Sequence, residues 1–378
     1  MFKDSIFVIA GRTGGPLLPA MAIAKQLTNY EPIIVGVKGG FESQFAVNER
    51  VQLLTLPEAK LTIASFGNLN FFEIIIELFK TVIMLFKLVF SFIKSIYYLI
   101  KHKPKAIITA GSFLSVPMGY ASKITNTLRL TNTKIIVHQQ DAKISLSNKL
   151  IARIADKITC FFEASIAQYA PYKCEVTTNP IDYTRFTDKY ADSIKIDHKL
   201  KLFIDQKTKP LLLIFGGGSG AFVINKWVNE NIADLTKKFN VLHLTGVLQE
   251  TSVYNIPQSD GYFPLQFLNQ EMPVVINASS LVICRAGMSS ITELVYCHKP
   301  AFLVPIPNSH QLDNAQEVTK YFPTLRQLHT ADKPGKENWI KTIDELYPTY
   351  FASIVYPDKE SIKKSFDDYI QSLKSLLK

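Results

Sequence analysis

Short apolar runs alternate with amphipathic stretches along most of the chain. In the first half these runs have the length and composition of buried strands, and they lie at residues 5–10, 32–37, 106–110 and 134–138. Helix-like segments, such as residues 16–27, separate them. Continuous apolar runs of this length are typical of parallel strands that are covered on both faces. The first half therefore predicts a doubly wound α/β domain.

The same plan restarts after Asn179-Pro180. The strand-like runs of the second half lie at residues 210–215, 240–244, 274–276, 281–284 and 301–304, with a glycine loop at 216–221 and a helix at 222–237. We therefore predict two Rossmann-like domains, residues 1–181 and 182–361, with a ligand cleft between them at the carboxyl ends of their strands. The amphipathic end of the chain, residues 362–378, is expected to pack back onto the first domain.

Residues 70–103 form the most unusual pattern, a long Phe/Ile/Leu-rich helix with one narrow polar stripe. The charges that recur every seven residues are Glu73, Lys80, Lys87, Lys94 and Lys101. Lysines at this spacing would be costly in the middle of a bilayer, so a membrane span is disfavoured. Two interpretations stay open: a helix mostly buried against the sheet, or a contact with an anionic membrane surface near residues 71–92. We favour the membrane contact.

Composition narrows the class of protein. The chain has 378 residues, of which 47% are hydrophobic and 20% charged, and this is ordinary for a globular protein. The net charge of +10 indicates an anionic partner, although surface lysines alone would also explain it. The sequence contains no helix-turn-helix signature and no aromatic-plus-basic RNA motif, which disfavours a nucleic-acid partner.

The cysteines and the N-terminus bear on the compartment. Cys160, Cys174, Cys284 and Cys297 contain no Cys-x-x-Cys pair, and their separations resemble neither a zinc module nor a disulfide framework. We therefore expect a reducing cytoplasm and no bound metal. The first residues run directly into an apolar strand and glycines, so no signal peptide is expected.

Two glycine-rich turns, residues 11–15 and 216–220, each stand between a strand and a helix. Such turns bring backbone N–H groups and a helix N-terminus close to phosphate oxygens. Neither turn matches an ATP-type P-loop or a dinucleotide fingerprint. The alternative is that the glycines serve only close packing of helix on strand.

Residues 284–294, CRAGMSSITEL, follow a predicted strand. Gly287 and Ser289 would start a helix whose N-terminus faces a diphosphate, and the carboxylate of Glu293 would accept hydrogen bonds from ribose hydroxyls. The alternative is that Ser289 or Ser290 forms an N-capping box with Glu293. The next loop, residues 305–315, carries His310, Gln311 and Asn314, which are suited to hydroxyl recognition; an exposed polar loop is the alternative.

These motifs, in this order, resemble the MurG family of glycosyltransferases. The resemblance is carried by AGRTGGPLLPAMAIA (10–24), AGSFLSVPMGYAS (110–122), HQQDAKISLSNKLIARIAD (138–156), TNPID (178–182), GGGSGAFVIN (216–225), CRAGMSSITEL and PIPNSHQLDNA. It covers residues 5 to about 320.

The resemblance implies a GT-B fold and an inverting transfer without metal or cofactor. Such enzymes move N-acetylglucosamine from UDP-N-acetylglucosamine to a polyprenyl-diphosphate-linked muramyl-pentapeptide during peptidoglycan synthesis. They work as peripheral proteins on the cytoplasmic face of the cell membrane. The first domain would accordingly bind the acceptor and the membrane, and the second the nucleotide sugar.

The resemblance also assigns residues. The acceptor-facing residues are Arg12, Thr13, Gly14 and Gly15. The donor-binding residues are Gly217, Gly218, Ser219, Arg285, Gly287, Ser289, Glu293, Gln311 and Asn314. Within the donor group Glu293 holds the ribose, and Gln311 and Asn314 read the sugar hydroxyls.

The chain also departs from the family pattern. Pro16 stands where GGTGGH has histidine, the family HEQN is His138-Gln139-Gln140-Asp141, and Asp182 replaces the arginine of NPVR, with Arg185 nearby. Because the family's proposed base is missing, we take Asp141 as the candidate general base, against the alternative of a loop or helix-cap residue. The departures leave two other functions open: a related GT-B enzyme with a changed sugar or acceptor, and a non-catalytic relative.

Overall fold

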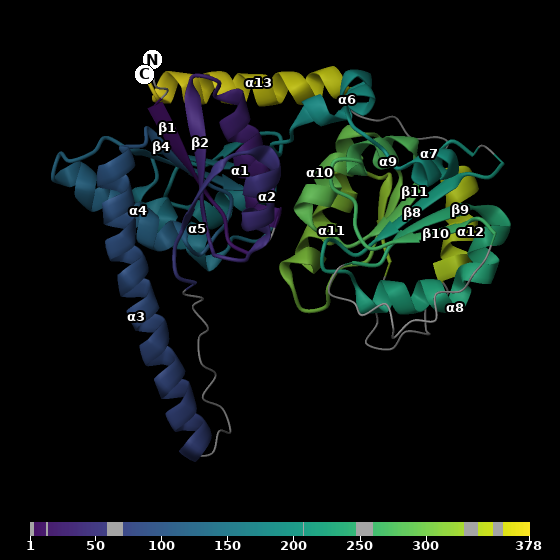
Figure 1. Cartoon of the computed structure of the whole chain (residues 1–378), viewed down its shortest axis with the longest axis horizontal. Coiled ribbons are helices and arrows are strands. Elements are labelled where there is room, and N and C mark those ends of the chain that lie inside the picture. Colours follow the sequence, from purple (N-terminus) through teal and green to yellow (C-terminus); the bar gives the residue numbers. More distant parts are fainter. Residues whose placement is uncertain are drawn as a thin grey trace. The chain divides into compact units, whose positions relative to one another are not determined.

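The chain divides into two compact units in the computed structural model (Figure 1). The first unit consists of residues 1–181 and 365–378, and the second of residues 182–364. The structure describes residues 4–12, 14–58, 71–206, 208–246, 260–328, 339–350 and 358–378. Both units are α/β, as the alternating pattern predicts.

The first unit is built on a parallel sheet of seven strands among the described residues, in the order β3-β2-β1-β4-β5-β6-β7. Its strands are β1 (Asp4–Ile9), β2 (Tyr30–Gly36), β3 (Gln52–Thr55), β4 (Ala106–Thr109), β5 (Lys134–Gln139), β6 (Lys157–Cys160) and β7 (Glu175–Val176). Its helices are α1 (Gly14–Gln26), α2 (Phe41–Glu49), α3 (Phe71–His102), α4 (Ser115–Thr127) and α5 (Leu146–Ile151), with short 3₁₀ turns at Ala152–Ile154 and Glu163–Tyr169. The four strands predicted for this half are confirmed within two residues at each end.

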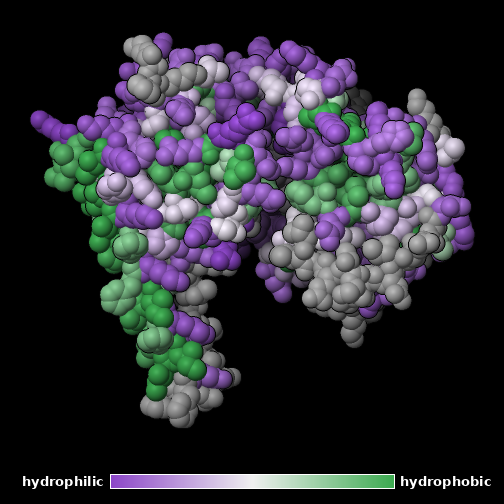
Figure 2. All heavy atoms as spheres, viewed as in Figure 1, coloured by the Kyte–Doolittle hydropathy of each residue, from purple (hydrophilic) through white to green (hydrophobic). Residues whose placement is uncertain are grey.

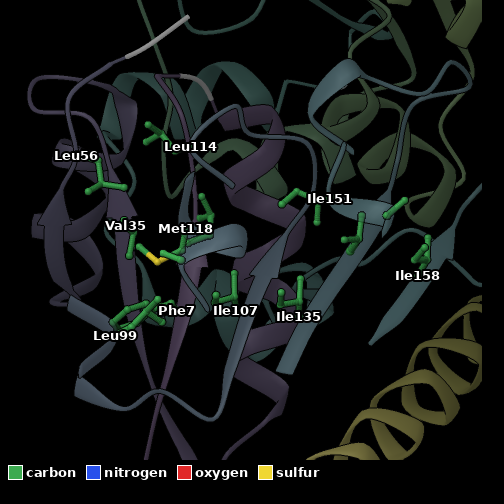
Figure 3. Close-up of a cluster of buried hydrophobic side chains, with 14 of the residues drawn as sticks. Phe7, Val35, Leu56, Leu99, Ile107, Leu114, Met118, Ile135, Ile151 and Ile158 are labelled. Atoms are coloured by element: carbon green, nitrogen blue, oxygen red, sulfur yellow. The ribbon is translucent and has the colours of Figure 1, made fainter. Parts of the chain in front are cut away.

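An apolar layer holds the sheet to helices α3, α4 and α5 (Figure 3). Phe7 of β1 pairs in register with Ile33 of β2 and Ile107 of β4, and the three side chains are buried. Figure 3 shows residues from these strands facing Leu99 of α3 and Met118 of α4. The central strands bury side chains on both faces, which explains their unbroken apolar runs.

The second unit repeats the plan with a six-stranded parallel sheet in the described residues, ordered β10-β9-β8-β11-β12-β13. Its strands are β8 (Leu211–Phe215), β9 (Asn240–Leu244), β10 (Tyr262–Leu265), β11 (Leu281–Cys284), β12 (Ala301–Leu303) and β13 (Leu325–Gln327). Its helices are α6 (Asp188–Ser193), α7 (His198–Ile204), α8 (Phe222–Lys238), α9 (Met272–Ala278), α10 (Met288–Tyr296), α11 (His310–Tyr321) and α12 (Trp339–Tyr350), after a 3₁₀ turn at Tyr183–Phe186. The last helix, α13 (Lys359–Leu376), starts in this unit and ends in the first.

The strand predicted at residues 274–276 is wrong, because these residues lie in helix α9. Pro273 occupies the first turn of that helix, where a missing N–H costs nothing. Three consecutive apolar residues fit a buried helix turn as well as a strand.

The first unit contains a buried polar network that includes Asn179 and Tyr369. These two residues lie near the two points at which the chain passes between the units, after residues 181 and 364. His138 lies at the carboxyl end of β5; its Nε2–H donates to Asn179 Oδ1 at 2.8 Å, and its Nδ1 lies 3.0 Å from Thr159 Oγ1. The Thr159 hydroxyl oxygen also lies 3.2 Å from the Tyr369 hydroxyl oxygen of α13, within hydrogen-bond distance. Burial lowers the pKa of His138 to about 4, so the ring is neutral at pH 7.

Helix α3 has two distinct parts. Its C-terminal part is anchored: Ser91 Oγ donates to the Pro57 carbonyl at 2.9 Å, Tyr98 OH donates to the Thr55 carbonyl at 3.1 Å, and Leu99 is fully buried. The preceding part exposes many large apolar side chains: Ile75, Ile76, Leu78, Phe79, Val82, Ile83, Leu85, Phe86, Val89, Phe90 and Ile93. Figure 2 shows a green, hydrophobic surface along this helix. The prediction of a mostly buried helix is therefore wrong for this part.

Among the residues that the structure describes, no helix is both long and apolar enough to cross a membrane.

The second unit contains a histidine whose titration we expect to weaken the fold in acid. Burial lowers the pKa of His243 to about 4; the ring lies 2.9 Å from Tyr262 OH through Nδ1 and 3.1 Å from Asn225 Oδ1 through Nε2. A folded-state pKa below the ordinary 6.5 gives stability that is complete above pH 6.5 and falls by about 1.4 kcal/mol per unit as the pH drops towards 4.

The chain's two tryptophans, Trp227 and Trp339, pack against each other in this unit with ring centroids 5.0 Å apart, so tryptophan fluorescence reports its unfolding. We expect the urea midpoint of this signal to fall between pH 6.5 and 5 more steeply for the wild type than for His243→Gln. Parallel loss in the two proteins would show that other groups cause the acid sensitivity.

Candidate functional site

Loops of the first unit gather at the carboxyl ends of β1, β4 and β5. Strand β1 has β2 on one side and β4 on the other, so the chain reverses its direction of winding at β1 and β4. In parallel sheets ligands bind at such a switch point. Residues 10–15 follow β1, residues 110–114 follow β4, and residues 140–145 follow β5.

Gly11 marks how closely the first two of these loops approach. A Cβ atom on Gly11 would lie 2.9 Å from the Ser112 hydroxyl oxygen. Ser112 is buried, and its hydroxyl accepts a hydrogen bond from the Leu114 N–H at 3.2 Å. The glycine therefore serves close packing of two loops, which is the alternative that the sequence left open for this turn.

Gln140 ties the β5 loop to the first glycine-rich turn. Its amide Nε2 donates to the Gly15 carbonyl at 3.1 Å, and the side chain is buried. Within α1, the carbonyl of residue 15 would ordinarily accept from the N–H of residue 19, but Pro19 has none. The Gln140 amide thus supplies the hydrogen bond to the Gly15 carbonyl that Pro19 cannot supply.

Three of the four predicted acceptor residues, Arg12, Gly14 and Gly15, lie in this turn; Thr13 lies outside the described residues. Pro16 is the third residue of α1, within the first turn, where a backbone N–H has no helical partner in any case. The helix therefore accepts proline at the family's histidine position without strain, and no titratable group takes its place there.

The backbone around Asp141 is held by the neighbouring Gln139. Its Nε2 donates to the carbonyls of Asp141 at 2.7 Å and Lys143 at 3.0 Å, while its Oε1 accepts from Asn148 Nδ2 at 2.6 Å and Tyr169 OH at 3.1 Å. Asp141 itself is partly buried in the loop that follows β5. The Gln139 amide thus makes two hydrogen bonds as a donor and two as an acceptor. An ionised carboxylate at residue 139 could not make the two donor bonds.

The loops of the second unit gather in the same way at the ends of β8, β11 and β12. Phe215 of β8 pairs with Cys284 of β11, so the loops 216–221 and 285–287 leave the sheet side by side. A Cβ atom on Gly216 would overlap Ala221, and Gly217 has φ of 87°, a left-handed value that favours glycine. Gly217, Gly218 and Ser219 are exposed.

Arg285 directs its side chain to backbone carbonyls at the end of β12. Its Nη1 lies 3.1 Å from the Val304 carbonyl and 3.2 Å from the Pro305 carbonyl. Burial lowers the pKa of this guanidinium. Arg285 therefore positions the β12 loop beside the turn that follows β11.

Helix α10 begins at this turn with Gly287 as its N-cap residue and no side-chain capping bond. The capping-box alternative is therefore wrong, since Glu293 lies in the second turn of the helix. Space around a Cβ on Gly287 is open to 4 Å. The Ser289 hydroxyl oxygen is buried without a hydrogen-bond partner among the described residues. An unpaired hydroxyl in the first turn of a helix is available to an anionic ligand.

Glu293 and Arg185 form the charged part of this site. Burial raises the pKa of the Glu293 carboxyl to about 7, and the nearby positive charge of Arg185 opposes the rise. Arg185 lies on the 3₁₀ turn before α6; its Nη2 donates to the Asn269 carbonyl at 3.1 Å, and its guanidinium stacks on Tyr190. Arg185 therefore places a cation beside the Glu293 carboxylate. Residue 182, where the family pattern has arginine, is aspartate in this chain.

The polar loop predicted at residues 305–315 is partly wrong, because helix α11 begins at His310. Ser309 caps that helix, and its hydroxyl accepts from the Gln311 N–H at 3.2 Å. Gln311 Oε1 accepts from the Ile306 N–H, also at 3.2 Å. Asn314 is fully buried, and its Nδ2 lies 3.5 Å from the Ala286 carbonyl, which links α11 to the turn before α10.

One residue at the first site escaped the sequence analysis. Glu42, the second residue of α2, is fully buried, and its Oε1 accepts from the Val37 N–H at 2.6 Å and the Arg12 N–H at 3.2 Å. The sequence offered one signal, an acidic residue shortly after Gly39 and Gly40 in the stretch that follows the strand predicted at residues 32–37. Across the described residues, no group of three or more His, Cys, Asp or Glu side chains is arranged to hold a metal ion.

Comparison with known families gives the same division of the chain. The model described as "Glycosyltransferase family 28 N-terminal domain" matches residues 6–160, and the "Glycosyltransferase family 28 C-terminal domain" matches residues 211–349. Together the two matches span most of the chain.

The chain is similar along its length to curated bacterial proteins. It is 27% identical to a Clostridium botulinum protein, over 99% of this chain and 98% of that protein, and 29% identical to a Clostridium novyi protein, over 92% and 91%. Both relatives are named UDP-N-acetylglucosamine--N-acetylmuramyl-(pentapeptide) pyrophosphoryl-undecaprenol N-acetylglucosamine transferase.

Solved structures show the same fold at low identity. MurG of Acinetobacter baumannii superposes with a TM-score of 0.66 at 18% identity, covering 99% of this chain and 100% of that one. UGT89C1 of Arabidopsis thaliana, solved with UDP-L-rhamnose, superposes with a TM-score of 0.65 at 11% identity over the whole of both chains. The GT-B fold expected from the sequence is confirmed.

Proposed function

The chain belongs to glycosyltransferase family 28, and from that premise we propose that it transfers N-acetylglucosamine from UDP-N-acetylglucosamine to a lipid-linked muramyl-pentapeptide. The names of relatives that match the chain almost end to end support this reaction. The observation that carries this proposal is the first half of helix α10. Its first turn has the unpaired Ser289 hydroxyl, and its second turn has the partly buried Glu293 carboxylate.

The donor would bind along this helix of the second unit. The N–H groups at Gly287 and Ser289 face the diphosphate, and their partial positive charge stabilises the negative charge that grows on the leaving UDP. Glu293 accepts hydrogen bonds from the ribose hydroxyls, and the loop at Gly217, Gly218 and Ser219 closes on the diphosphate. Gln311 and Asn314 lie at and near the start of α11, where they would read the sugar hydroxyls.

The acceptor would bind the first unit, with Arg12, Gly14 and Gly15 beside its diphosphate. Its C4 hydroxyl oxygen attacks C1 of the sugar from the face opposite the diphosphate. The bond between C1 and the diphosphate oxygen breaks, UDP leaves with the electron pair, and the configuration at C1 is inverted. Asp141 takes the hydroxyl proton, and no metal or other cofactor takes part.

Helix α3 would hold the protein to the cytoplasmic face of the membrane as a peripheral protein. Its exposed apolar side chains extend from Ile75 to Ile93, about 27 Å along the axis. Lys80 and Lys87 line one edge of this face at seven-residue spacing. This combination is typical of a helix that lies in the interface, with lysines that meet anionic headgroups.

A transfer assay tests the reaction itself. The protein is incubated with UDP-linked and other nucleotide sugars and with lipid-linked acceptors, and products are identified by mass. We expect addition of one N-acetylhexosamine to the muramyl-pentapeptide lipid. Transfer of another sugar or to another acceptor would indicate the related enzyme that the changes at residues 16, 139, 141 and 182 suggest. Binding without product would indicate a non-catalytic relative.

The pKa of Glu293, about 7, predicts a pH-dependent donor affinity. Protonation removes the negative charge that accepts the ribose hydrogen bonds, so the KM for UDP-N-acetylglucosamine should rise as the pH falls below 7. Glu293→Gln should raise this KM about tenfold to hundredfold at pH 8 and abolish its pH dependence. Glu317→Gln, on the neighbouring helix α11, is the control. A wild-type KM that is constant from pH 6 to 8 would contradict the role of Glu293.

Asp141→Asn should lower kcat about 10² to 10⁴-fold with little change in either KM, because the amide cannot take the hydroxyl proton. Steady-state kinetics with both substrates varied measure this. Asp4→Asn, at the opposite end of the same sheet, should keep the wild-type rate. The assignment fails if Asp141→Asn turns over like the wild type.

Replacing Phe79, Phe86 and Phe90 together by serine should weaken binding to phosphatidylglycerol-containing vesicles at least about a hundredfold, because burial of each ring contributes about 1.5–3 kcal/mol. Flotation measures this binding. All three side chains are exposed, so the melting temperature should not fall. Leu128→Ser, which removes an equally exposed side chain of the same unit, is the control. Equal flotation of all three proteins would rule out the membrane role of α3.

A further inference from the structure

Arg12 has a backbone conformation that favours glycine. Its φ is 55°, in the left-handed region, and the family sequence GGTGGH has glycine at this place. A side chain there costs conformational free energy that glycine avoids. Strain of this kind persists where the surrounding structure imposes it, and it is concentrated at functional sites.

The surroundings of Arg12 impose this conformation on its backbone. Glu42 Oε1 accepts its N–H at 3.2 Å, and its carbonyl accepts from the Phe41 N–H at 3.3 Å. Side chains on Gly36 or Gly40 would overlap Glu42, so the carboxylate fills its space completely. The backbone contacts do not involve the guanidinium, and glycine would make them equally well. The backbone contacts therefore do not explain why residue 12 is arginine, and the explanation must lie in its side chain.

The guanidinium is presented to solvent at the start of α1. The side chain is 65% exposed, and its Nε lies 2.6 Å from Glu58 Oε2 in an ion pair whose second partner is 33% exposed. Exposed pairs of this kind are weak and exchange readily for a stronger partner. Two residues further on, at Gly14, α1 begins, and its unpaired N–H groups attract anions.

A second observation at the same turn indicates a missing ligand. Gln140 is 4% exposed and donates through Nε2 to the Gly15 carbonyl, but its Oε1 is buried without a hydrogen-bond partner among the described residues. A buried carbonyl oxygen of this kind is satisfied when a hydroxyl or amide group of a ligand donates to it. The turn thus combines an exposed cationic side chain with an unsatisfied acceptor. A ligand that carries both phosphate and hydroxyl or amide groups would contact both.

We propose that Arg12 binds the diphosphate of the acceptor, and that Glu58 holds its guanidinium until the acceptor displaces it. The inference rests on the proposed transfer and adds to it the group that recognises the acceptor diphosphate in this chain. A guanidinium can form two parallel hydrogen bonds with phosphate oxygens. The ion pair with Glu58 uses only Nε, so the terminal N–H groups of Arg12 stay available for phosphate. The first glycine-rich turn thereby carries a cation at residue 12, where the family pattern has glycine.

Arg50 offers a matched control. It too is an arginine with φ of 55°, it is exposed, and it caps helix α2 of the same unit. Arg12→Gly and Arg50→Gly should both keep or raise the melting temperature, since each relieves a left-handed side chain. Only Arg12→Gly should change acceptor recognition. This separates loss of a ligand contact from loss of structure.

The kinetic test varies the lipid-linked acceptor at saturating donor. We expect Arg12→Gly to raise the acceptor KM about tenfold to hundredfold with the donor KM unchanged, Arg12→Lys to be intermediate, and Glu58→Gln to lower the acceptor KM a few-fold. An unchanged acceptor KM in Arg12→Gly would overturn the proposal, as would a parallel rise in both KM values.

Calorimetry with farnesyl diphosphate makes the test independent of turnover. The wild type and Arg50→Gly should bind this probe alike, Arg12→Gly should bind it at least about tenfold more weakly, and all three should bind UDP equally. Equal binding of farnesyl diphosphate by all three proteins would refute the role of Arg12. Absence of transfer by a wild type that shows the expected binding would refute the proposed reaction instead.

Discussion

The hydrogen bond from Gln140 to the Gly15 carbonyl is the contact on which the first site depends. Pro19 removes the N–H that would close the first turn of α1, and a side chain 125 residues away supplies the missing donor. This bond fixes the β5 loop against the glycine-rich turn, so the positions of Asp141 and of the start of α1 are set together. A carbonyl left unpaired there would cost about 1–3 kcal/mol, and the bond from Gln140 avoids this cost in this chain.

In the second unit, too, side-chain donors form hydrogen bonds with backbone carbonyls near the ends of the strands. Arg285 satisfies the carbonyls of Val304 and Pro305, and Asn314 approaches that of Ala286. In both units, side-chain donors occupy carbonyl oxygens near the ends of the strands, while the N–H groups at the helix starts stay available. The result is a positive electrostatic environment built from backbone dipoles. A site of this kind suits a diphosphate, and it requires glycine where the loops touch.

The sequence predicted the central buried strands and the longest helices, because buried parallel strands and amphipathic helices have distinct periods. The shorter strands β3, β6, β7, β10 and β13 were not predicted. It failed where a short pattern fits two structures. Residues 274–276 are three apolar residues that α9 buries, and the decisive signal was Pro273 in the first turn. At residues 305–315 Ser309 is a helix cap, but its pattern also fits a loop. The capping box failed because the helix begins at Gly287, which places Glu293 beyond the first turn.

The chemistry of the sites was only partly readable, since much of it arises from contacts between distant segments. Arg12 was identified by its place in a motif, but its left-handed backbone and its carboxylate partners, Glu42 and Glu58, follow from contacts with the β2–α2 loop and with the segment after β3. Glycine at residue 12 would suit the backbone better, whereas arginine adds a positive charge at this turn. Pro16 fits the same logic, because a first helix turn tolerates proline while the turn before it carries the cation. The proposed anion-binding turn of the first unit therefore has its cation at residue 12, before the start of α1.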